Sequence, residues 1–307
     1  MQDQEKYEID EEPESAPGYR TYEVYQRERV GETTNLIKPR ELISDQYLLD
    51  PYPLVELLRE NYPCYRDWLG NRFWLTRYDD VTSVFADERN YETRPKTWFY
   101  NLENYGENLW NEVPVQRAFE SSIDDHIETI TGDILFDWDS GHFDLAVDFC
   151  AKIPLQLWGP ILNISEEQLS QFIPSFLIMQ RGVGWDPLRK QDGLDALKNL
   201  ETLLNPIFLD RKKEPGADFI SAIAQCSLAE RDTQVSDLVV TILELDHETF
   251  HGGLANLWFN LLKHPNELGK IREDARMLKF AWLETLRCTP PVISAKRFAR
   301  TEIERFG

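Results

Sequence analysis

The chain has 307 residues, of which 54 are Asp or Glu and 33 are Lys or Arg, so its formal net charge is −21 at pH 7. Such an acidic chain is a poor candidate for binding nucleic acid or an anionic membrane, because like charges repel. Apolar residues make up 42% of the chain and aromatic residues 12%, which is enough for a substantial hydrophobic core. At about 150 residues per domain, this length allows one or two domains.

The first residues carry no recognisable targeting signal. Residues 1–15 contain seven acids and one base, and they lack the basic and apolar regions of a secretory signal. No stretch approaches the ~18 consecutive apolar residues of a membrane helix. We therefore expect residues 1–17 to form an acidic disordered tail and residues 18–307 to form a single domain. The expected location is the cytoplasm, because widely spaced cysteines suit a reducing compartment; they are Cys64, Cys150, Cys226 and Cys288.

The first part of the globular region predicts two helices around a hairpin. Apolar residues have helical spacing in segments 53–59 and 78–85. Between them, two aromatic-rich runs flank a Gly-Asn pair at positions 70–71, which predicts a hairpin. The segment 94–113 is rich in Asn and aromatic residues without a regular pattern, which indicates loops.

From about residue 115 onward the pattern is mainly helical. Ser165 and Gln168 form a predicted capping box at the start of one helix. Ser236 is expected to cap the longest helix, which runs to Lys263 and would span roughly 40 Å. The other predicted helices occupy 116–137, 145–158, 166–180, 190–210, 216–226 and 278–287, and residues 292–307 look extended.

One motif in the longest helix is typical of a zinc site. Residues 247–251 read H-E-T-F-H, in which His247 and His251 would bind zinc and Glu248 would act as a general base. Such a site needs a third protein ligand. Leu254 and Leu257 stand where one family of zinc proteases continues with Gly and His, so that form is excluded. A zinc hydrolase remains an alternative, with a third ligand from Glu267, Glu273 or Glu284.

Acidic residues interrupt the apolar pattern of the same helix. Glu244, Asp246 and Glu248 alternate with Leu243 and Leu245. Carboxylates on different faces of an otherwise apolar helix are costly unless they are paired or hydrated. At least one of them is therefore expected to line a cavity or an interface.

Several motifs, in a consistent order, resemble those of the cytochrome P450 monooxygenases. Residues 246–249 (D-H-E-T), followed by 261–265, resemble the distal helix of that family, and residues 284–287 (E-T-L-R) before Pro290-Pro291 resemble its E-x-x-R helix. The resemblance covers roughly residues 45–307. Further similar segments are 50–59 and 73–81 near the start, 143–154 in mid-chain, and 214–219 before the distal helix.

The resemblance implies a mainly α-helical, cytochrome P450-like fold with a small β-sheet. It also implies a haem-dependent monooxygenase that oxidises a small organic substrate with electrons from a transfer partner. By the same resemblance, Glu248 and Thr249 would deliver protons, and Glu284 and Arg287 would form a buried structural ion pair. Arg297 would contact a haem propionate.

Three departures from the family pattern count against haem chemistry. The family holds its iron with a Cys thiolate in a C-terminal loop, whereas this sequence stops at Gly307 before that loop, and Cys288 lacks its surroundings. Asp246 replaces a small Gly of the distal helix, and a carboxylate over an apolar haem face is unfavourable without a partner. Asn108 and Glu112 stand where the family has its propionate-binding His and Arg.

Two roles consequently stay open beside the zinc alternative. The chain is either a C-terminally truncated monooxygenase that is inactive alone, or a haem-less helper subunit of a biosynthetic enzyme. Missing C-terminal elements would leave apolar surface uncovered, which favours a protein partner. Nucleic acid and membranes are not expected partners.

Overall fold

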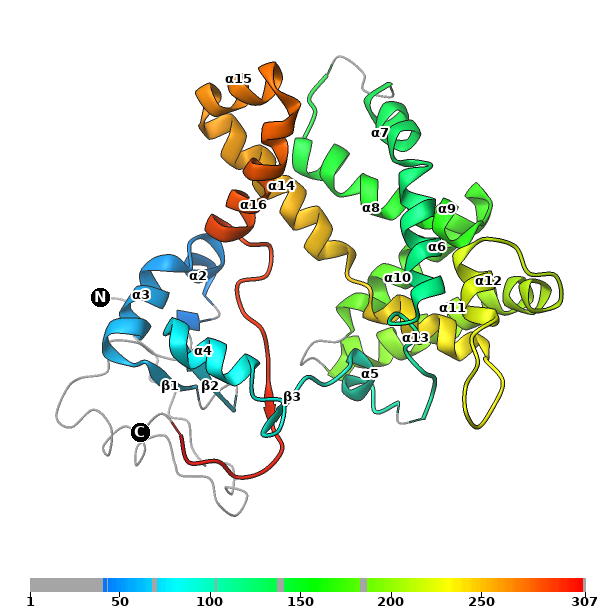
Figure 1. Cartoon of the computed structure of the whole chain (residues 1–307), viewed down its shortest axis with the longest axis horizontal. Coiled ribbons are helices and arrows are strands. Elements are labelled where there is room, and N and C mark those ends of the chain that lie inside the picture. The colour runs from blue at the N-terminus through cyan, green and yellow to red at the C-terminus, as the bar shows by residue number, and fades with distance from the viewer. Residues whose placement is uncertain are drawn as a thin grey trace, which may run out of the picture. The chain divides into compact units, whose positions relative to one another are not determined.

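The computed structural model describes residues 41–305 except 43, 68–70, 103, 137–140 and 183–186 (Figure 1). The predicted acidic tail over residues 1–17, and its boundary with the globular region, lie outside the described residues. The chain divides into two compact units. The smaller unit comprises the residues up to Thr93 together with those from Arg297 onward, and the larger unit is Arg94–Lys296.

The smaller unit contains the predicted hairpin and the helices on either side of it. Helix α2 (Asp45–Leu49) and helix α3 (Tyr52–Asn61) precede the hairpin, and helix α4 (Tyr78–Phe85) follows it. Strand β1 (Cys64–Asp67) pairs antiparallel with β2 (Arg72–Leu75). Strand β3 (Tyr91–Glu92) pairs antiparallel with β4 (Phe298–Ala299), so two segments about 200 residues apart in sequence lie side by side.

The carboxylate of Asp67 holds the hairpin together. It accepts hydrogen bonds from Arg72 Nε at 2.8 Å and from Trp74 Nε1 at 3.2 Å. Asn71 adopts φ 46°, in the left-handed region that Asn tolerates, and its side chain accepts a hydrogen bond from Arg66 at 2.7 Å. The hairpin and helices share a small core of Leu42, Tyr47, Leu58, Tyr62 and Tyr65.

The larger unit is built almost entirely from helices. In Figure 1, α10–α13 gather beside α6 and α9, whereas α14–α16 form a second group. The elements are α5 (Lys96–Phe99), α6 (Val113–Asp124), α7 (Ile127–Phe136), the π-helix η2 (Leu145–Cys150), α8 (Lys152–Gln156), α9 (Trp158–Leu162), α10 (Glu166–Arg181), α11 (Pro187–Lys213), α12 (Phe219–Ala224), α13 (Val235–Glu244), α14 (His247–Lys263), α15 (Pro265–Glu273), the 3-10 turn η3 (Ala275–Met277) and α16 (Leu278–Cys288).

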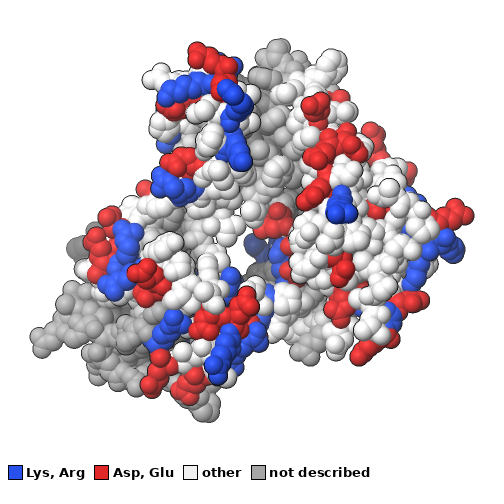
Figure 2. Space-filling view, in the orientation of Figure 1, with Lys and Arg blue, Asp and Glu red and all other residues white. Residues whose placement is uncertain are grey.

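Aromatic side chains fill the core of the larger unit. The rings of Phe172 and Phe176 on α10 stack with centroids 5.4 Å apart, and Trp158 packs against both. The predicted capping box of α10 is confirmed, because Ser165 Oγ accepts from the backbone of Gln168 and the Gln168 side chain accepts in return. Figure 2 shows Lys and Arg side chains interspersed with Asp and Glu over the visible face.

The run Leu145–Leu162 is long and apolar enough to cross a membrane, judged by length and composition alone. Its mean hydropathy is 1.2, and 44% of the run is buried. Ile153, Trp158 and Leu162 belong to the core of the larger unit. Core helices commonly combine such hydropathy and burial, so the run is weak support for a membrane segment.

The predicted single long helix from Ser236 to Lys263 is wrong. The chain forms α13 and α14 instead, separated by Leu245 at ψ 126° and Asp246 at ψ 102°, both extended. The Asp246 side chain starts a new helix by accepting the backbone N–H of Glu248. Helix α13 begins after Gln234 rather than after Ser236.

Candidate functional site

The structure places the site residues predicted from the sequence on three elements. Glu248 and Thr249 lie in the first turn of α14. Glu284 and Arg287 lie one turn apart on α16. Arg297 precedes β4 in the smaller unit and is therefore described apart from the others.

Asp246 organises the first turn of α14. Its Oδ1 accepts the backbone N–H of Glu248 at 2.9 Å, and its Oδ2 accepts the hydroxyl of Thr249 at 2.8 Å. Partial burial alone would raise the pKa of Asp246, but the Thr249 hydrogen bond and the charge of Lys96 outweigh it and lower that pKa. The carboxylate is therefore ionised at neutral pH, and the Thr249 hydroxyl donates to it.

Gln180, at the end of α10, occupies the break between α13 and α14. Its Nε2 donates to the carbonyl of Leu243 at 3.2 Å and to that of Leu245 at 2.9 Å. Its Oε1 accepts the ammonium of Lys96 at 2.8 Å. One side chain thus satisfies two carbonyls released by the break, and it links α5 to the junction.

Glu244, the last residue of α13, contacts the start of α5. Its Oε1 accepts the backbone N–H of Lys96 at 2.7 Å. Burial raises the pKa of Glu244, against the lowering effects of this hydrogen bond and the Lys96 charge. Burial also lowers the pKa of Lys96, although Asp246, Glu244 and Glu248 oppose that change. Glu244 is therefore paired within the larger unit, and the expectation that an acid of this segment lines a cavity or an interface stays a prediction.

His247 is half-buried and packs against an aromatic residue of the core. Its ring lies 5.0 Å from that of Phe176, and burial lowers its pKa. Its Nδ1 is buried and has no hydrogen-bond partner among the described residues. Across the described residues, no three His, Cys, Asp or Glu side chains form a group suited to a metal ion. The structure therefore offers no third ligand to complete a zinc site with His247 and His251.

The Glu284–Arg287 ion pair forms as predicted, but the prediction that it is buried is wrong. The carboxylate and guanidinium are 2.7 Å apart, and their side chains are 61% and 70% exposed. The hydrogen bond from Arg287 lowers the pKa of Glu284 to about 2. The pair faces outward because other residues of α16 face α14, where Trp282 lies against Gly253.

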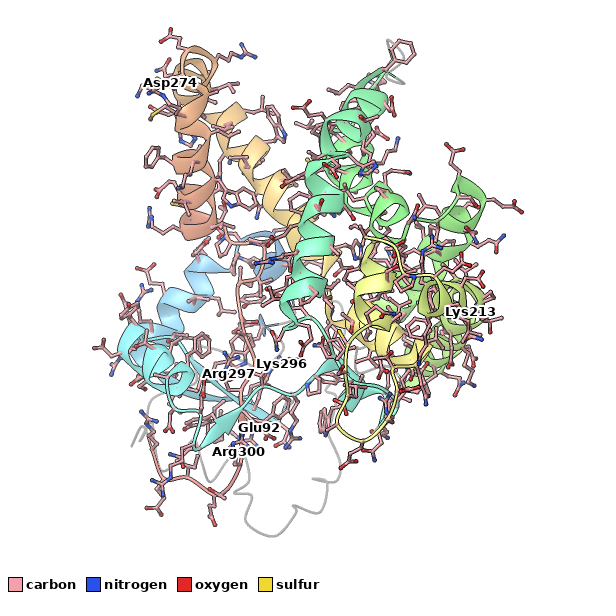
Figure 3. All side chains as sticks on the ribbon, turned by 45° about the vertical axis from the view of Figure 1, so that its right-hand side comes forward. Glu92, Lys213, Asp274, Lys296, Arg297 and Arg300 are labelled. Atoms are coloured by element: carbon pink, nitrogen blue, oxygen red, sulfur yellow. The ribbon has the colours of Figure 1, made fainter. Side chains whose placement is uncertain are left out.

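Arg297 lines a hollow of about 290 Å³ in the smaller unit. Its guanidinium lies over the ring of Phe85, 4.3 Å from the centroid. Arg300, on the same segment, forms an ion pair with Glu92 at 3.0 Å. Figure 3 shows Arg297, Arg300 and Glu92 near one another at the β3–β4 ribbon. The hollow around Arg297 therefore carries charges of both signs, because Asp87, Glu88 and Glu92 line it together with Arg297 and Arg300.

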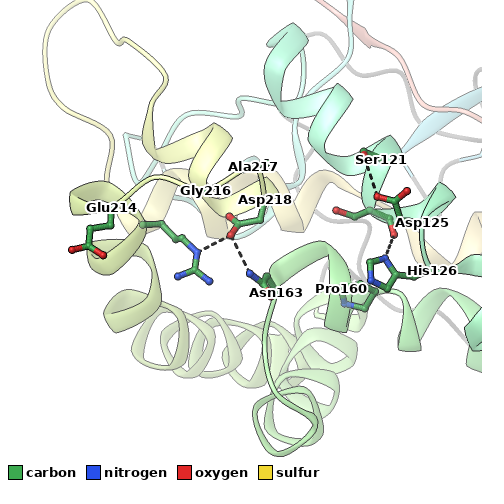
Figure 4. A pocket seen from close by; sticks show the side chains of 11 residues that line it. Ser121, Asp125, His126, Pro160, Asn163, Glu214, Gly216, Ala217 and Asp218 are labelled. Carbon is green, nitrogen blue, oxygen red and sulfur yellow. Dashed lines mark hydrogen bonds and ion pairs between the residues drawn. The ribbon is translucent and has the colours of Figure 1, made fainter.

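A second hollow, of about 440 Å³, lies in the larger unit and has no counterpart in the sequence predictions (Figure 4). On one wall, Asp218 accepts from Arg211 Nε at 2.7 Å and from the Asn163 amide at 3.3 Å. On another wall lie Asp125 and His126 from the end of α6. Arg211, Asp218 and Asn163 are thus hydrogen-bonded to one another, which fixes the positions of their side chains.

Comparison with curated proteins finds several cytochrome P450s, although no family model matches the chain. A cytochrome P450 of Bacillus subtilis is 24% identical over 295 residues, which cover 85% of this chain and 70% of that protein. The epothilone C/D epoxidase of Sorangium cellulosum is 26% identical over 85% of this chain and 70% of its own length. The 6-deoxyerythronolide B hydroxylase of Saccharopolyspora erythraea is 25% identical, with coverages of 87% and 74%.

Solved structures agree with the sequence relatives. CYP109E1 of Bacillus megaterium, in complex with corticosterone, superposes with a TM-score of 0.68 at 19% identity, over 86% of this chain and 73% of that one. P450 RauA gives a TM-score of 0.67 at 17% identity, with coverages of 88% and 75%. The sequence relatives and the solved structures alike are cytochrome P450s, so the predicted resemblance to that family is confirmed. The predicted fold, mainly helical with a small sheet, is confirmed.

The first turn of α14 presents a charged side chain where the resemblance to the cytochrome P450s implies a haem face. The ionised carboxylate of Asp246 would be unfavourable against the apolar face of a haem. Burial raises the pKa values of the Cys150 and Cys226 thiols, and a hydrogen bond with Glu284 raises that of Cys288. These shifts favour the neutral thiol form of the three side chains.

Sequence reasoning missed Lys96 and Gln180, which complete the polar cluster around the junction. Lys96 lies in a segment predicted to be a loop, and Gln180 is one polar residue near the end of an amphipathic helix. Their role depends on contacts between distant segments. The alternation of acids with Leu at 243–248 was the available signal that polar partners would be needed there.

Proposed function

We propose that this chain is a haem-free member of the cytochrome P450 family that acts in the cytoplasm as a binding subunit for an enzyme of small-molecule biosynthesis. The observation that carries the proposal is the ionised carboxylate of Asp246 at the position where the family has Gly. It is held by the Thr249 hydroxyl and the Glu248 N–H. These contacts commit the hydroxyl that would otherwise serve proton delivery.

The comparisons support a biosynthetic setting and a protein partner. The relatives include enzymes named for oxidising epothilones and 6-deoxyerythronolide B. A solved chain of this fold, P450BioI, is described in complex with an acyl carrier protein that carries a hexadecenoic acid. It has a TM-score of 0.65 and 18% identity to this chain. A chain with this fold can therefore bind both a small organic group and a carrier protein.

Titration of the purified full chain with haemin tests the proposal. We expect no Soret band from a stoichiometric complex in the wild-type chain. We expect tighter haemin binding for Asp246→Gly, because that change removes the carboxylate. Asp246→Asn is the matched control, since it keeps the size of the side chain and removes its charge. Stoichiometric haem binding by the wild-type chain would contradict the proposal.

A second candidate is a haem-dependent monooxygenase that oxidises a small organic substrate with electrons from a transfer partner. It is favoured by the names of the relatives, which are an epoxidase, a hydroxylase and a monooxygenase. In that case Glu248 and Thr249 would deliver protons, and Arg297 would hold a propionate. The same titration decides between the candidates, because this one requires a wild-type haem complex whose activity falls in Thr249→Val.

A further inference from the structure

The hollow of about 440 Å³ in the larger unit lies where three helices end (Figure 4). Its lining includes Asp125 directly after α6, Asn163 directly after α9 and Glu214 directly after α11. The C-terminal end of a helix carries a partial negative charge, because its last carbonyl groups have no partner within the helix. The three helix ends therefore give the hollow a negative potential.

Two of these helix ends lack the basic residues that usually offset such a charge. The last turns of α6 and α9 contain no Lys or Arg. Helix α6 instead ends in Asp124 and is followed by Asp125, although the helix dipole disfavours carboxylates at this end. Among the described residues, the Asp125 carboxylate accepts one hydrogen bond, from the Ser121 hydroxyl at 3.4 Å, and forms no ion pair. A cation bound in the hollow would offset this charge.

The side chains of the hollow suit an organic cation better than a metal ion. Within the described part of the chain, no three His, Cys, Asp or Glu side chains come together as metal ligands would. An ammonium group needs fewer charged ligands, since its N–H groups can also donate to carbonyl and hydroxyl oxygens. The volume of the hollow lies within the range of small-molecule sites in proteins. We therefore expect an amine rather than a metal ion.

The other wall presents a guanidinium that is held in place but not fully used. Arg211 donates from Nε to Asp218 at 2.7 Å, whereas its two terminal nitrogens have no hydrogen-bond partner among the described residues. The Arg211 side chain is only 26% exposed. Asp218 is itself fixed by the Asn163 amide at 3.3 Å and by the backbone N–H of Ser221 at 2.8 Å. The terminal nitrogens of a fixed guanidinium match the two oxygens of a carboxylate.

We propose that this hollow binds a small zwitterion, with its ammonium group at Asp125 and its carboxylate at Arg211. The two residues belong to different walls, so a chain of atoms must separate the two charges of the ligand. The ends of α6 and α9 add to the attraction for the ammonium group. This inference is independent of the proposed function, because none of these residues belongs to the cluster around Asp246, and it holds with or without haem.

Isothermal titration calorimetry of the full chain tests the site with three ω-amino acids. The probes are 4-aminobutanoate, 6-aminohexanoate and 8-aminooctanoate, which differ in the distance between their charges. We expect saturable binding of at least one of them. The amine and the carboxylate of the same chain length carry one charge each and should bind about tenfold more weakly. Failure of all three amino acids to bind, or equal binding of the amine alone, overturns the proposal.

Asp125→Asn keeps the size of the side chain and removes its charge. It should weaken binding of the best probe by about fivefold, without lowering the melting temperature, because the end of α6 loses a disfavoured charge. Asp124→Asn is the matched control, since Asp124 ends the same helix but is not among the residues that line the hollow.

Arg211→Gln removes the group proposed to bind the carboxylate and should weaken binding of the same probe by about tenfold. Should this variant fail to fold because Asp218 loses its partner, Asp125→Asn decides. An affinity for the probe that is the same in the wild-type chain and in Asp125→Asn overturns the proposal.

Discussion

The two ends of α13 hold acidic residues in opposite ways. At its N-terminal end, the fully buried carboxylate of Asp237 accepts from both terminal nitrogens of Arg231, at 2.6 and 2.8 Å. It also accepts the backbone N–H groups of Glu107 and Gln234, each at 2.7 Å. At its C-terminal end, Glu244 accepts the backbone N–H of Lys96 at 2.7 Å and has a further backbone hydrogen bond with Thr97, and a side chain satisfies the adjacent carbonyls.

Asp237 is an anchor, by which we mean a buried carboxylate whose hydrogen bonds hold neighbouring segments in place. Glu244 has fewer hydrogen bonds and is not an anchor in this sense. Every acceptor position of Asp237 is used, and these hydrogen bonds lower its pKa against the effect of burial. Moving any partner would leave a buried charge unsatisfied. Burial dominates at Glu244 and raises its pKa, so its charged form is less favourable in the folded chain than in the unfolded chain. The N-terminal end therefore fixes the loop before α6 through a fully hydrogen-bonded charge, whereas burial opposes the charge at the C-terminal end.

The largest expected effect is the loss of the anchor in Asp237→Ala. Removing this carboxylate leaves the Arg231 guanidinium and two backbone N–H groups without their acceptor, which should destabilise the chain by about 3 kcal/mol. Urea denaturation followed by Trp fluorescence measures the change. Asp232→Ala is the control, because the Asp232 side chain is 93% exposed in its contact with Lys212. A loss no larger than that of the control would contradict the anchor role.

The two ends should also respond to pH with opposite signs, which Glu244→Gln tests. The pKa of Glu244 is higher in the folded chain than in the unfolded chain, so the folded chain binds the proton more readily. As pH falls from neutral toward about 4, the wild-type chain should gain unfolding free energy relative to Glu244→Gln. Denaturation curves for both chains across this range give the difference.

Asp237→Asn supplies the opposite case for the same experiment. The pKa of Asp237 is lowered on folding, so its stabilising effect is present above the unfolded pKa of about 3.9 and is lost below it. The wild-type chain should therefore lose unfolding free energy relative to Asp237→Asn as pH falls through the folded pKa. The same sign at both ends would show that they do not differ in the way described.

A smaller effect on the unfolding free energy is expected from Thr249→Val, in the first turn of α14. The change keeps the shape of the side chain and removes the hydroxyl that donates to Asp246 at 2.8 Å. The unfolding free energy should fall by about 1 kcal/mol, the usual contribution of one such hydrogen bond. Thr202→Val is the control, because the Thr202 hydroxyl donates to the Lys198 carbonyl on the exposed face of α11. An equal loss of unfolding free energy in the two variants would show that the hydrogen bond from Thr249 to Asp246 stabilises the chain no more than an ordinary exposed one.

Much of the fold could be predicted from local sequence. The period of apolar residues located most helices, and the aromatic runs located the β1–β2 hairpin. The Ser165–Gln168 capping box was predicted residue by residue, because its two partners lie three positions apart. Short-range hydrogen bonds and helical periodicity depend on residues that are close in sequence, so they can be predicted from the sequence alone.

The junction could not be predicted, because its partners are distant in sequence. Gln180 lies 63 and 65 residues from the carbonyls it binds, and Lys96 lies 148 residues before Glu244. Local pattern favoured a continuous helix, and tertiary contacts overrode it. The E-x-x-R spacing likewise predicted that Glu284 and Arg287 would pair, but it could not show which side of α16 faces its neighbour.

The smallest expected effect on stability comes from the exposed ion pair on α16. This pair shows how little an ion pair contributes when solvent surrounds it. Both side chains of Glu284 and Arg287 are mostly exposed, so solvent screens their attraction even though the carboxylate is strongly ionised. Glu284→Gln should therefore leave the melting temperature unchanged within experimental error. Asp237→Ala, measured in parallel, provides the response of a pair that is buried. A large loss in Glu284→Gln would mean that this pair is covered in solution, as the sequence resemblance predicted.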